Sequence, residues 1–485
     1  MKSFSIFVLA MVTALALTSL TSAHATVSLT PAAGAPATNV TVKATGFDAS
    51  TVIDVYFDTT DVALTTSNAK GRVTATFQVP ASTQPGRHWV TVVERRTDAA
   101  AQISYNVFVD WPQGGWGPSK RSFNPYENTV NTGNVSQLTR IWSKVLDGFG
   151  NSKIPIVYNN TIFVRGVDQV VRAFSLAGKL LWTATMPNAG INPLTPAAAD
   201  DKVFFSDSNG NVIAYPYNCH TNGSTCTPAW TTNIGSAIAG GLTIRGGSLY
   251  APAADGKVYV LKARNGAITG TVTTLSGAAL TTWIALGTDG RGWVASGTQL
   301  NGTTNNTGGS FSLTFPGTLS APAVASDEGF VTASDSFVRQ SFGWATATGG
   351  SGCGIPPAPA YANGVVYAAG CTSLGAYDAS TGAALWTITT PSVSEGLTYA
   401  NGVLYTCIGN RASAYAASYG GRLWSGGGCS AAPIMVNGVL YVTYANLNAY
   451  TLDGAKTTLV PMGRPDPKKL RPTTVKTTAP IDPGE

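Results

Sequence analysis

The chain repeats one short pattern, in which an Asn-Gly pair precedes an apolar strand that contains tyrosine. Residues 363–367, 401–405 and 437–441 read Asn-Gly-Val-Val-Tyr, Asn-Gly-Val-Leu-Tyr and Asn-Gly-Val-Leu-Tyr. Asn and Gly tolerate the positive φ angles of a two-residue hairpin turn, and the following residues suit a buried strand. Weaker copies lie at residues 159–163, 201–204, 246–250, 290–293 and 327–330. Together they give eight anchors about 40 residues apart, a period typical of propeller arrays.

Composition agrees with an all-β protein of more than one domain. The 485 residues exceed the size of one ordinary domain. Gly 54 and Pro 27, among many Thr, Val and Tyr, describe strands and turns, and no long stretch has helical periodicity. Charged residues make up only 11%, which suits a compact β body.

The net charge of +6 lies mostly outside the folded body. Lys2 contributes one charge, and residues 456–485 hold six basic against three acidic residues, so these two parts carry +4 of the +6. The remaining body is near neutral and has no Lys- or Arg-rich face. The sequence therefore excludes nucleic acid as the expected partner.

The first 25 residues have the form of a secretory signal peptide. One basic residue precedes an apolar run from Phe4 to about Leu17, and Ala23-His24-Ala25 gives a cleavage signal. The site lacks the cysteine of a lipid anchor, and no later stretch is apolar enough to span a bilayer. We expect an exported bacterial protein, periplasmic or secreted, without a membrane span.

Six cysteines then meet an oxidising environment, which favours disulfides. Cys219 and Cys226 bracket a short polar insert and are expected to staple a hairpin loop. For the other four, Cys353, Cys371, Cys407 and Cys429, the pairs 353–371 and 407–429 are favoured among fifteen possible connectivities. Metal binding is the alternative. No CxxC spacing occurs, and the mature chain has only two histidines, His88 and His220.

Residues 26–110 read as about seven short alternating strands, which predicts a β-sandwich. The stretches 40–44, 52–58, 71–80, 85–92 and 103–109 carry the pattern. This part resembles bacterial immunoglobulin-like modules of exported proteins, which implies a spacer or adhesion role. His88 and Trp89 are expected to belong to a strand rather than to a site.

Residues 111–455 are expected to form the second domain, after a linker at residues 111–116. The lead-in at 121–127 and 140–142 and the repeats at 255–261 and 376–386 resemble pyrroloquinoline-quinone-type (quinoprotein-like) propellers. The resemblance implies an eight-bladed β-propeller. The Trp residues that close several repeats then pack between blades: Trp142, Trp182, Trp230, Trp386 and Trp424. Residues 140–144 are expected to supply the missing strand of the last blade, and residues 456–485 to be largely disordered.

The same resemblance implies a quinone-dependent dehydrogenase that holds calcium and quinone in its funnel and uses an aspartate base. The chain lacks the adjacent cysteine pair and the long inserts of such enzymes, so we assign no catalytic, cofactor-binding or metal-binding residue. Most carboxylates lie where hairpins or repeat turns need them: Asp168, Asp200, Asp201, Asp255, Asp289, Asp327, Glu328, Asp378 and Asp453. Two histidines in separate domains do not make a catalytic triad.

Glu395 is the exception, because no turn requires it. We expect it on the innermost strand of a blade, facing the channel, as a solvated carboxylate or, alternatively, a functional one. The favoured hypothesis is a non-catalytic binding or scaffold protein, without a cofactor. Such a protein would be similar to the outer-membrane assembly propeller of the same repeat family, or would act as an adhesin. Its partner would be another envelope or extracellular protein or a surface ligand. The alternative is the dehydrogenase.

Overall fold

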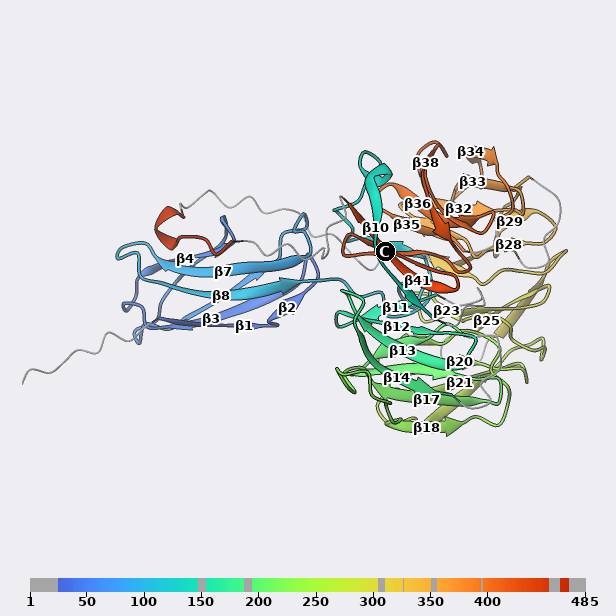
Figure 1. The fold of residues 1–485 in the computed structure, drawn as a ribbon, viewed down its shortest axis with the longest axis horizontal. Coiled ribbons are helices and arrows are strands. Elements are labelled where there is room, and N and C mark those ends of the chain that lie inside the picture. The colour runs from blue at the N-terminus through green and yellow to red at the C-terminus, as the bar shows by residue number, and fades with distance from the viewer. Residues whose placement is uncertain are drawn as a thin grey trace, which may run out of the picture.

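The chain forms an all-β protein in this computed structural model, which describes residues 25–146, 154–186, 194–303, 310–325, 327–349, 356–393, 396–452 and 463–470. The strands within these ranges make ten sheets. Within those ranges the only helical elements are the short 3-10 turns η1 (Val135–Gln137) and η2 (Pro467–Lys469). No helix in this part of the chain is long and apolar enough to cross a membrane. The sheets form two groups, one blue and one running from green to red in Figure 1.

Two sheets of the first group pack on one core and form a β-sandwich. The first contains β1 (Thr26–Thr30), β3 (Asn39–Thr45) and β6 (Val73–Gln78). The second contains, in spatial order, β2 (Ala33–Gly34), β8 (Ala100–Val107), β7 (Gly86–Glu94), β4 (Val52–Phe57) and β5 (Thr60–Thr66). Val40 and Val42 of the first sheet are buried with Ile53, Val55 and Val90 of the second, so alternate residues of each strand build the core.

His88 is a structural residue of this sandwich, as its place in a strand predicted. It lies on β7, with Nδ1 2.6 Å from Asp58 Oδ2 and Nε2 2.8 Å from Gln84 O. Burial opposes protonation, but the hydrogen bonds with Asp58 and Gln84 raise the pKa of His88. Because both ring nitrogens are engaged, His88 has no free position for a ligand.

The other eight sheets are each built on four antiparallel strands, which follow chain order in all but the last sheet. Sheet 1 is β11 (Ile156–Tyr158), β12 (Thr161–Arg165), β13 (Val170–Ser175) and β14 (Leu180–Thr185), and sheet 2 is β15 (Ala197–Ala199), β16 (Lys202–Ser206), β17 (Asn211–Pro216) and β18 (Trp230–Asn233). Sheet 3 is β19 (Thr243–Arg245), β20 (Ser248–Pro252), β21 (Lys257–Lys262) and β22 (Ile268–Thr273), and sheet 4 is β23 (Ala285–Leu286), β24 (Gly292–Ser296), β25 (Gln299–Thr303) and β26 (Ser310–Thr314).

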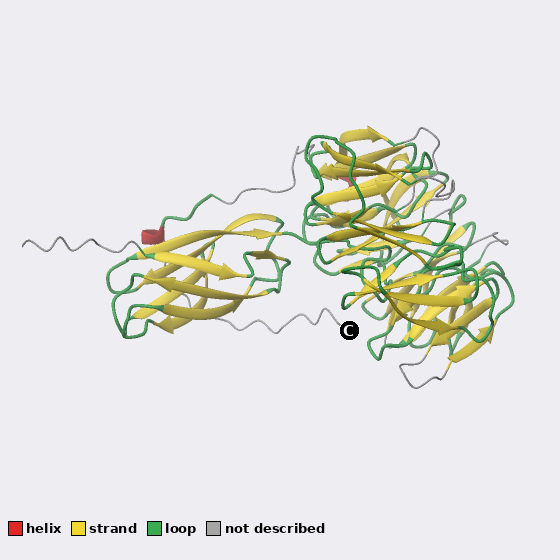
Figure 2. Cartoon of the chain, turned by 90° about the horizontal axis from the view of Figure 1, so that it is seen from below, coloured by secondary structure: helices red, strands yellow, loops and turns green. Residues whose placement is uncertain are grey.

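The second half of the group repeats the plan. Both groups of sheets consist of strands joined by loops (Figure 2). Sheet 5 is β27 (Ala323–Ala325), β28 (Glu328–Ala333), β29 (Phe337–Gln340) and β30 (Ala345–Ala347), and sheet 6 is β31 (Ala360–Ala362), β32 (Val365–Ala369), β33 (Ser373–Asp378) and β34 (Ala384–Thr389). Sheet 7 is β35 (Thr398–Ala400), β36 (Val403–Ile408), β37 (Arg411–Ala416) and β38 (Arg422–Gly428), to which β9 (Phe123–Asn124) is added. Sheet 8 is β39 (Ile434–Val436), β40 (Val439–Thr443), β41 (Asn446–Leu452) and β10 (Leu138–Val145).

The repeated Asn-Gly pairs are the turns between the first and second strands of their sheets. Asn363 and Gly364 have φ of 52° and 77°, and Asn401 and Gly402 have φ of 45° and 80°. The Asn437–Gly438 pair has the same signs, at 54° and 71°. Positive φ at both central residues is the geometry that Asn-Gly favours in a hairpin. The predicted hairpins are confirmed.

The sheets close into a ring through β10. This strand precedes sheet 1 in the chain but pairs antiparallel with β41 of sheet 8, with Trp142 opposite Ala449. Trp142 Nε1 in turn donates to Leu176 O of sheet 1 at 3.0 Å. The predicted use of residues 140–144 as the closing strand is therefore confirmed.

Tryptophans at or next to the outer strands connect six of the eight sheets to the next sheet. Trp182 Nε1 donates to Tyr217 O of sheet 2, and Trp230 Nε1 donates to Ala263 O of sheet 3. Trp386 and Trp424 make the same contact later in the ring. All five tryptophans that the repeat singled out thus lie between sheets. A sixth tryptophan in this role, Trp344, was not predicted from the sequence; its Nε1 donates to Ala379 O.

The disulfides agree with the predicted pairs as far as the structure describes them. Cys219 bonds to Cys226, and Cys407 bonds to Cys429. Cys371 is also disulfide-bonded, while its expected partner Cys353 lies outside the described residues.

Part of the tail differs from the expected disorder, since residues 463–470 fold against the sandwich (Figure 1). Leu470 is buried with Tyr56 and Val93. Gln102 Nε2 donates to Pro465 O at 2.8 Å. The Pro- and Lys-rich composition indicated disorder, but it did not reveal that one apolar residue, Leu470, has a place on the sandwich.

Candidate functional site

The segment between the two groups of sheets runs around the inside of the ring and bonds to every sheet in it. We call residues 109–124 the inner segment. Its hydrogen bonds reach the first strand of each of the eight sheets, in chain order: at Val157, Ala198, Ile244, Leu286, Val324, Tyr361, Tyr399 and Met435. Its last two residues form β9, which pairs parallel with β35. The sequence analysis predicted that residues 111–116 of this segment are a linker.

A tight turn in the inner segment places Lys120 in the interior. Gly115 has φ of 72°, and a β-carbon there would lie 2.8 Å from Lys120 Cα, so only glycine fits. Ser122 N closes the turn by donating to Gly115 O at 3.0 Å. Lys120 itself has φ of 58°, and its side chain is buried.

Lys120 is 1% exposed, which is unusual for a lysine. Its Nζ donates to Gln113 Oε1 at 3.0 Å and to Leu242 O at 3.2 Å, and lies 5.5 Å from the centre of the Trp283 ring. Burial lowers the pKa of Lys120 well below its usual value. The amine joins the inner segment to sheet 3. Nothing in the sequence marked Lys120, because its burial follows from the closed ring.

A buried carboxylate holds the chain just beyond the inner segment. Glu127 Oε1 accepts from Thr129 N at 3.0 Å and from Val130 N at 2.9 Å, and its Oε2 accepts from Gly438 N at 3.0 Å. Burial raises the pKa of Glu127, and these three donors oppose that rise. Asn437, in the same turn as Gly438, bonds to both backbone groups of Val109. Both ends of the inner segment are thus fastened to one Asn-Gly turn.

A cavity of about 480 Å³ lies at the centre of the ring. The stretch before or at the start of the first strand of every sheet contributes to its wall, together with Trp111, Gly115 and Ser122 of the inner segment. Most lining residues are Gly, Ala, Pro and Thr, and none of the described ones carries a charge. Glu395, the predicted channel residue, lies outside the described residues, although the neighbouring Gly396 lines the cavity.

The described wall of this cavity does not fit a calcium–quinone centre. Calcium takes six to eight oxygen ligands, including carboxylates, and an anionic quinone needs cationic partners. The wall offers hydroxyl groups, such as those of Thr195, Thr282 and Thr398, but neither kind of charged group. Across the described ranges no three or more His, Cys, Asp or Glu side chains gather in a way that could hold a metal ion.

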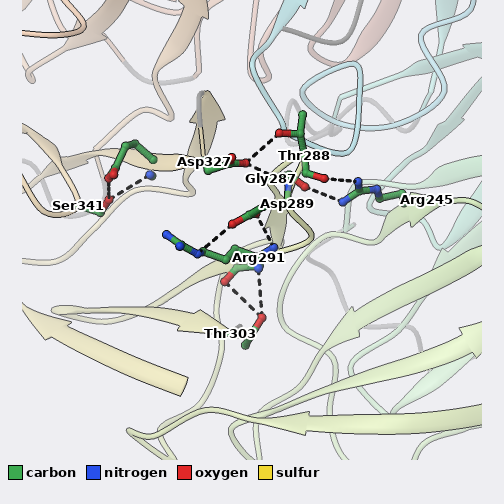
Figure 3. A network of polar contacts seen from close by, with 11 residues as sticks. Arg245, Gly287, Thr288, Asp289, Arg291, Thr303, Asp327 and Ser341 are labelled. Carbon is green, nitrogen blue, oxygen red and sulfur yellow. Dashed lines mark hydrogen bonds and ion pairs between the residues drawn. The ribbon is translucent and has the colours of Figure 1, made fainter. Parts of the chain in front are cut away.

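The acidic residues near the ring's turns serve the fold, as their positions predicted (Figure 3). Asp327 Oδ1 accepts from Thr288 Oγ1 at 3.0 Å and from Asp289 N at 3.2 Å. Partial burial opposes ionisation, but these donors hold the pKa of Asp327 below its usual value. Asp289 forms an ion pair with Arg291 at 3.0 Å. These carboxylates are engaged by neighbouring turns.

The chain is similar to known proteins both in sequence and in fold. A family model described as outer membrane protein assembly factor BamB matches residues 134–218 and 370–460. The structure is similar to quinohemoprotein alcohol dehydrogenase from Comamonas testosteroni, with a TM-score of 0.57 at 15% identity over 73% of this chain and 82% of that chain. The fold is that of a quinoprotein-type β-propeller. No curated protein matches the chain.

Two further solved structures are similar in fold. Quinohemoprotein alcohol dehydrogenase ADHIIG from Pseudomonas putida HK5 gives a TM-score of 0.56 at 15% identity, over 74% of this chain and 82% of that chain. A europium-containing methanol dehydrogenase gives 0.55 at 13% identity, over 69% of this chain and 89% of that chain. At such identities the likeness concerns the fold alone, because one fold hosts many chemistries.

Proposed function

We propose that the protein is an exported, non-catalytic binding or scaffold protein. It acts through its propeller on another protein or a surface ligand, in the bacterial cell envelope or outside the cell. One observation carries the proposal: the described wall of the central cavity is made of uncharged residues, chiefly Gly, Ala, Pro and Thr. This is where the sequence resemblance would put calcium and quinone. The match to the assembly-factor family supports a protein partner.

The proposal includes the finer architecture. We infer that the eight sheets are eight blades and that the sandwich is an immunoglobulin-like module spanning residues 26–110. The inner segment opens a propeller domain at 111–455, and residues 1–25 direct export and are then removed. The disulfides support an oxidising compartment. The sandwich would act as a spacer that holds the propeller away from its point of attachment.

Reconstitution with quinone and calcium tests the hypothesis that the protein is not an enzyme. The purified protein is incubated with pyrroloquinoline quinone and calcium, desalted, and examined for a bound quinone chromophore and for dye reduction with simple alcohols. We expect neither. A retained chromophore with alcohol-dependent dye reduction would establish the dehydrogenase instead. The Glu395→Gln variant extends the test, since a functional Glu395 predicts that the substitution weakens ligand binding.

Cross-linking in cells tests the binding role. The tagged full chain is cross-linked, recovered from envelope and medium fractions, and compared with a chain that lacks residues 26–108, which keeps the inner segment intact. We expect a defined protein partner that the truncated chain still captures if the propeller carries the contact. Recovery of the full chain alone from both fractions would contradict the scaffold role.

A further inference from the structure

One position on the outer strand holds an aromatic ring in seven of the eight sheets. The ring lies opposite the fourth residue of the third strand, as Trp182 does to Ala173, Trp386 to Ala376 and Phe311 to Gly302. The full set is Trp182, Trp230, Phe311, Trp344, Trp386, Trp424 and Trp142, in the order of sheets 1, 2, 4, 5, 6, 7 and 8. This ring fills the space between its own sheet and the next.

Sheet 3 is the exception. The equivalent residue is Gly270 of β22, which lies opposite Val260. A β-carbon at Gly270 would meet no atom within 4 Å. Five of the six residues of β22 are exposed. The place of the missing ring is therefore open rather than filled by a neighbouring side chain.

A groove of about 610 Å³ lies at this place, between sheets 3 and 4. Tyr250, Val260 and Gly270 line it from sheet 3, and Ile284 and Leu286 line it from the start of sheet 4. Its size is in the range of ligand sites, and its wall combines apolar side chains and one aromatic ring with threonines and Arg245.

Tyr250 lacks the ring that its equivalents contact. In other sheets the second-strand aromatic pairs with the outer-strand ring, with centroids 5.7 Å apart for Phe163 and Trp182 and 4.9 Å apart for Trp293 and Phe311. Tyr250 occupies the second-strand place opposite Val260, but β22 contains no aromatic residue. An aromatic ring entering the groove would recover the pairing that Tyr250 lacks.

Arg245 adds a cation to the lining of the groove. Its guanidinium donates to Gly287 O at 2.6 Å and to Thr288 O at 3.2 Å, so it is fixed in place by sheet 4 (Figure 3). A guanidinium beside a groove favours an aromatic occupant over an aliphatic one, because it is attracted to the face of a ring.

A tryptophan side chain in this groove would come from another molecule. The segments outside the described residues contain no Trp or Tyr, and their aromatic residues are Phe4, Phe7 and Phe149. We propose that the groove between sheets 3 and 4 binds a tryptophan side chain presented by a partner polypeptide. Tryptophan is chosen because six of the seven equivalent rings are indoles. This inference rests on the proposed binding function, to which it adds the contact surface and the partner's chemistry.

Peptide binding to the full chain tests the proposal. Acetyl-Gly-Trp-Gly-amide and acetyl-Gly-Leu-Gly-amide are titrated separately, with ligand-observed NMR as the readout. We expect the Trp peptide to bind at least tenfold more tightly than the Leu peptide. Equal affinity for the two peptides, or no binding of the Trp peptide, would overturn the proposal.

Two substitutions on β22 locate the contact. Gly270→Trp places an indole inside the groove and is expected to weaken Trp-peptide binding at least tenfold. Thr273→Trp adds the same side chain to the same strand at a residue that does not line the groove, and should leave binding unchanged. Tyr250→Leu, which removes the stacking ring and keeps an apolar side chain, should weaken binding about fivefold and serves if Gly270→Trp does not fold. Wild-type affinity in folded Gly270→Trp or in Tyr250→Leu would overturn the proposal.

The peptide assay and the cellular cross-linking test different claims, so their results can be told apart. Trp-peptide binding that Gly270→Trp removes, without any cross-linked partner in cells, would refute the scaffold role and retain the groove as an indole site. A cross-linked partner whose capture is unchanged in Gly270→Trp would retain the binding function and refute this surface.

Discussion

Asp110 is expected to make stability depend on pH where the sandwich meets the ring. Its Oδ1 accepts from Asn159 N at 2.9 Å, and burial raises the pKa of Asp110 from 3.8 to about 7. A difference of about three pKa units corresponds to at most about 4 kcal/mol. The folded state keeps this proton at pH values where the unfolded chain has lost it. Stability therefore falls as the pH rises from about 4 to about 7.

Asp110→Asn removes this dependence, because the amide is neutral and keeps an oxygen for Asn159 N. Urea unfolding, followed by tryptophan fluorescence and circular dichroism, is measured from pH 4.5 to 8.5. We expect the variant to gain up to about 4 kcal/mol relative to wild type across that range. Asp98→Asn, in an exposed turn, is the matched control and should parallel wild type. Parallel profiles for wild type and Asp110→Asn would refute the burial argument.

Three further substitutions test how the ring is held together. Trp182→Phe removes the donor to Tyr217 O in a fully buried place and should cost about 2 kcal/mol, measured by urea unfolding. Lys120→Met removes a buried amine whose pKa is lowered, so the variant should gain stability over wild type as the pH falls from 10 to 7. A difference in unfolding free energy that stays constant over this range would contradict the lowered pKa. Replacing Cys407 and Cys429 with Ala opens a loop closed by residues 22 apart and should cost about 3 kcal/mol under non-reducing conditions. Reduced wild type is its control.

The repeat could be predicted from sequence because its signals are local. Asn363 and Gly364 specify a turn by their own φ preferences, and each copy reports the same turn independently. The spacing of the closing tryptophans then follows from the strand plan. Trp344 was missed because it lies just ahead of the short strand β30, in a weak copy of the repeat. Ring closure was predictable because residues 140–144 resembled a final strand that preceded any complete repeat.

The inner segment could not be predicted, because its role exists only once the ring is closed. Gly115, Pro118 and Ser122 read locally as linker or turn residues. Their backbone groups find partners on sheets far apart in the chain, such as Leu286 and Tyr399. Burial of Lys120 has the same origin. Hydrophobic periodicity indicates the strands of each sheet, whereas most of this segment lies outside the sheets and only its last two residues, β9, join one.

Departures from a repeat carry the functional information in a ring built this way. Where the sheets agree, a residue is explained by packing, as the outer-strand indoles are. Gly270 breaks that agreement in the most exposed of the outer strands, and the groove that it leaves is lined by Tyr250 and bordered by a fixed guanidinium. The central cavity keeps the regularity of the ring, since every sheet contributes a similar small-residue stretch to its wall. The physical asymmetry of the molecule therefore points to the face between sheets 3 and 4 as its contact surface.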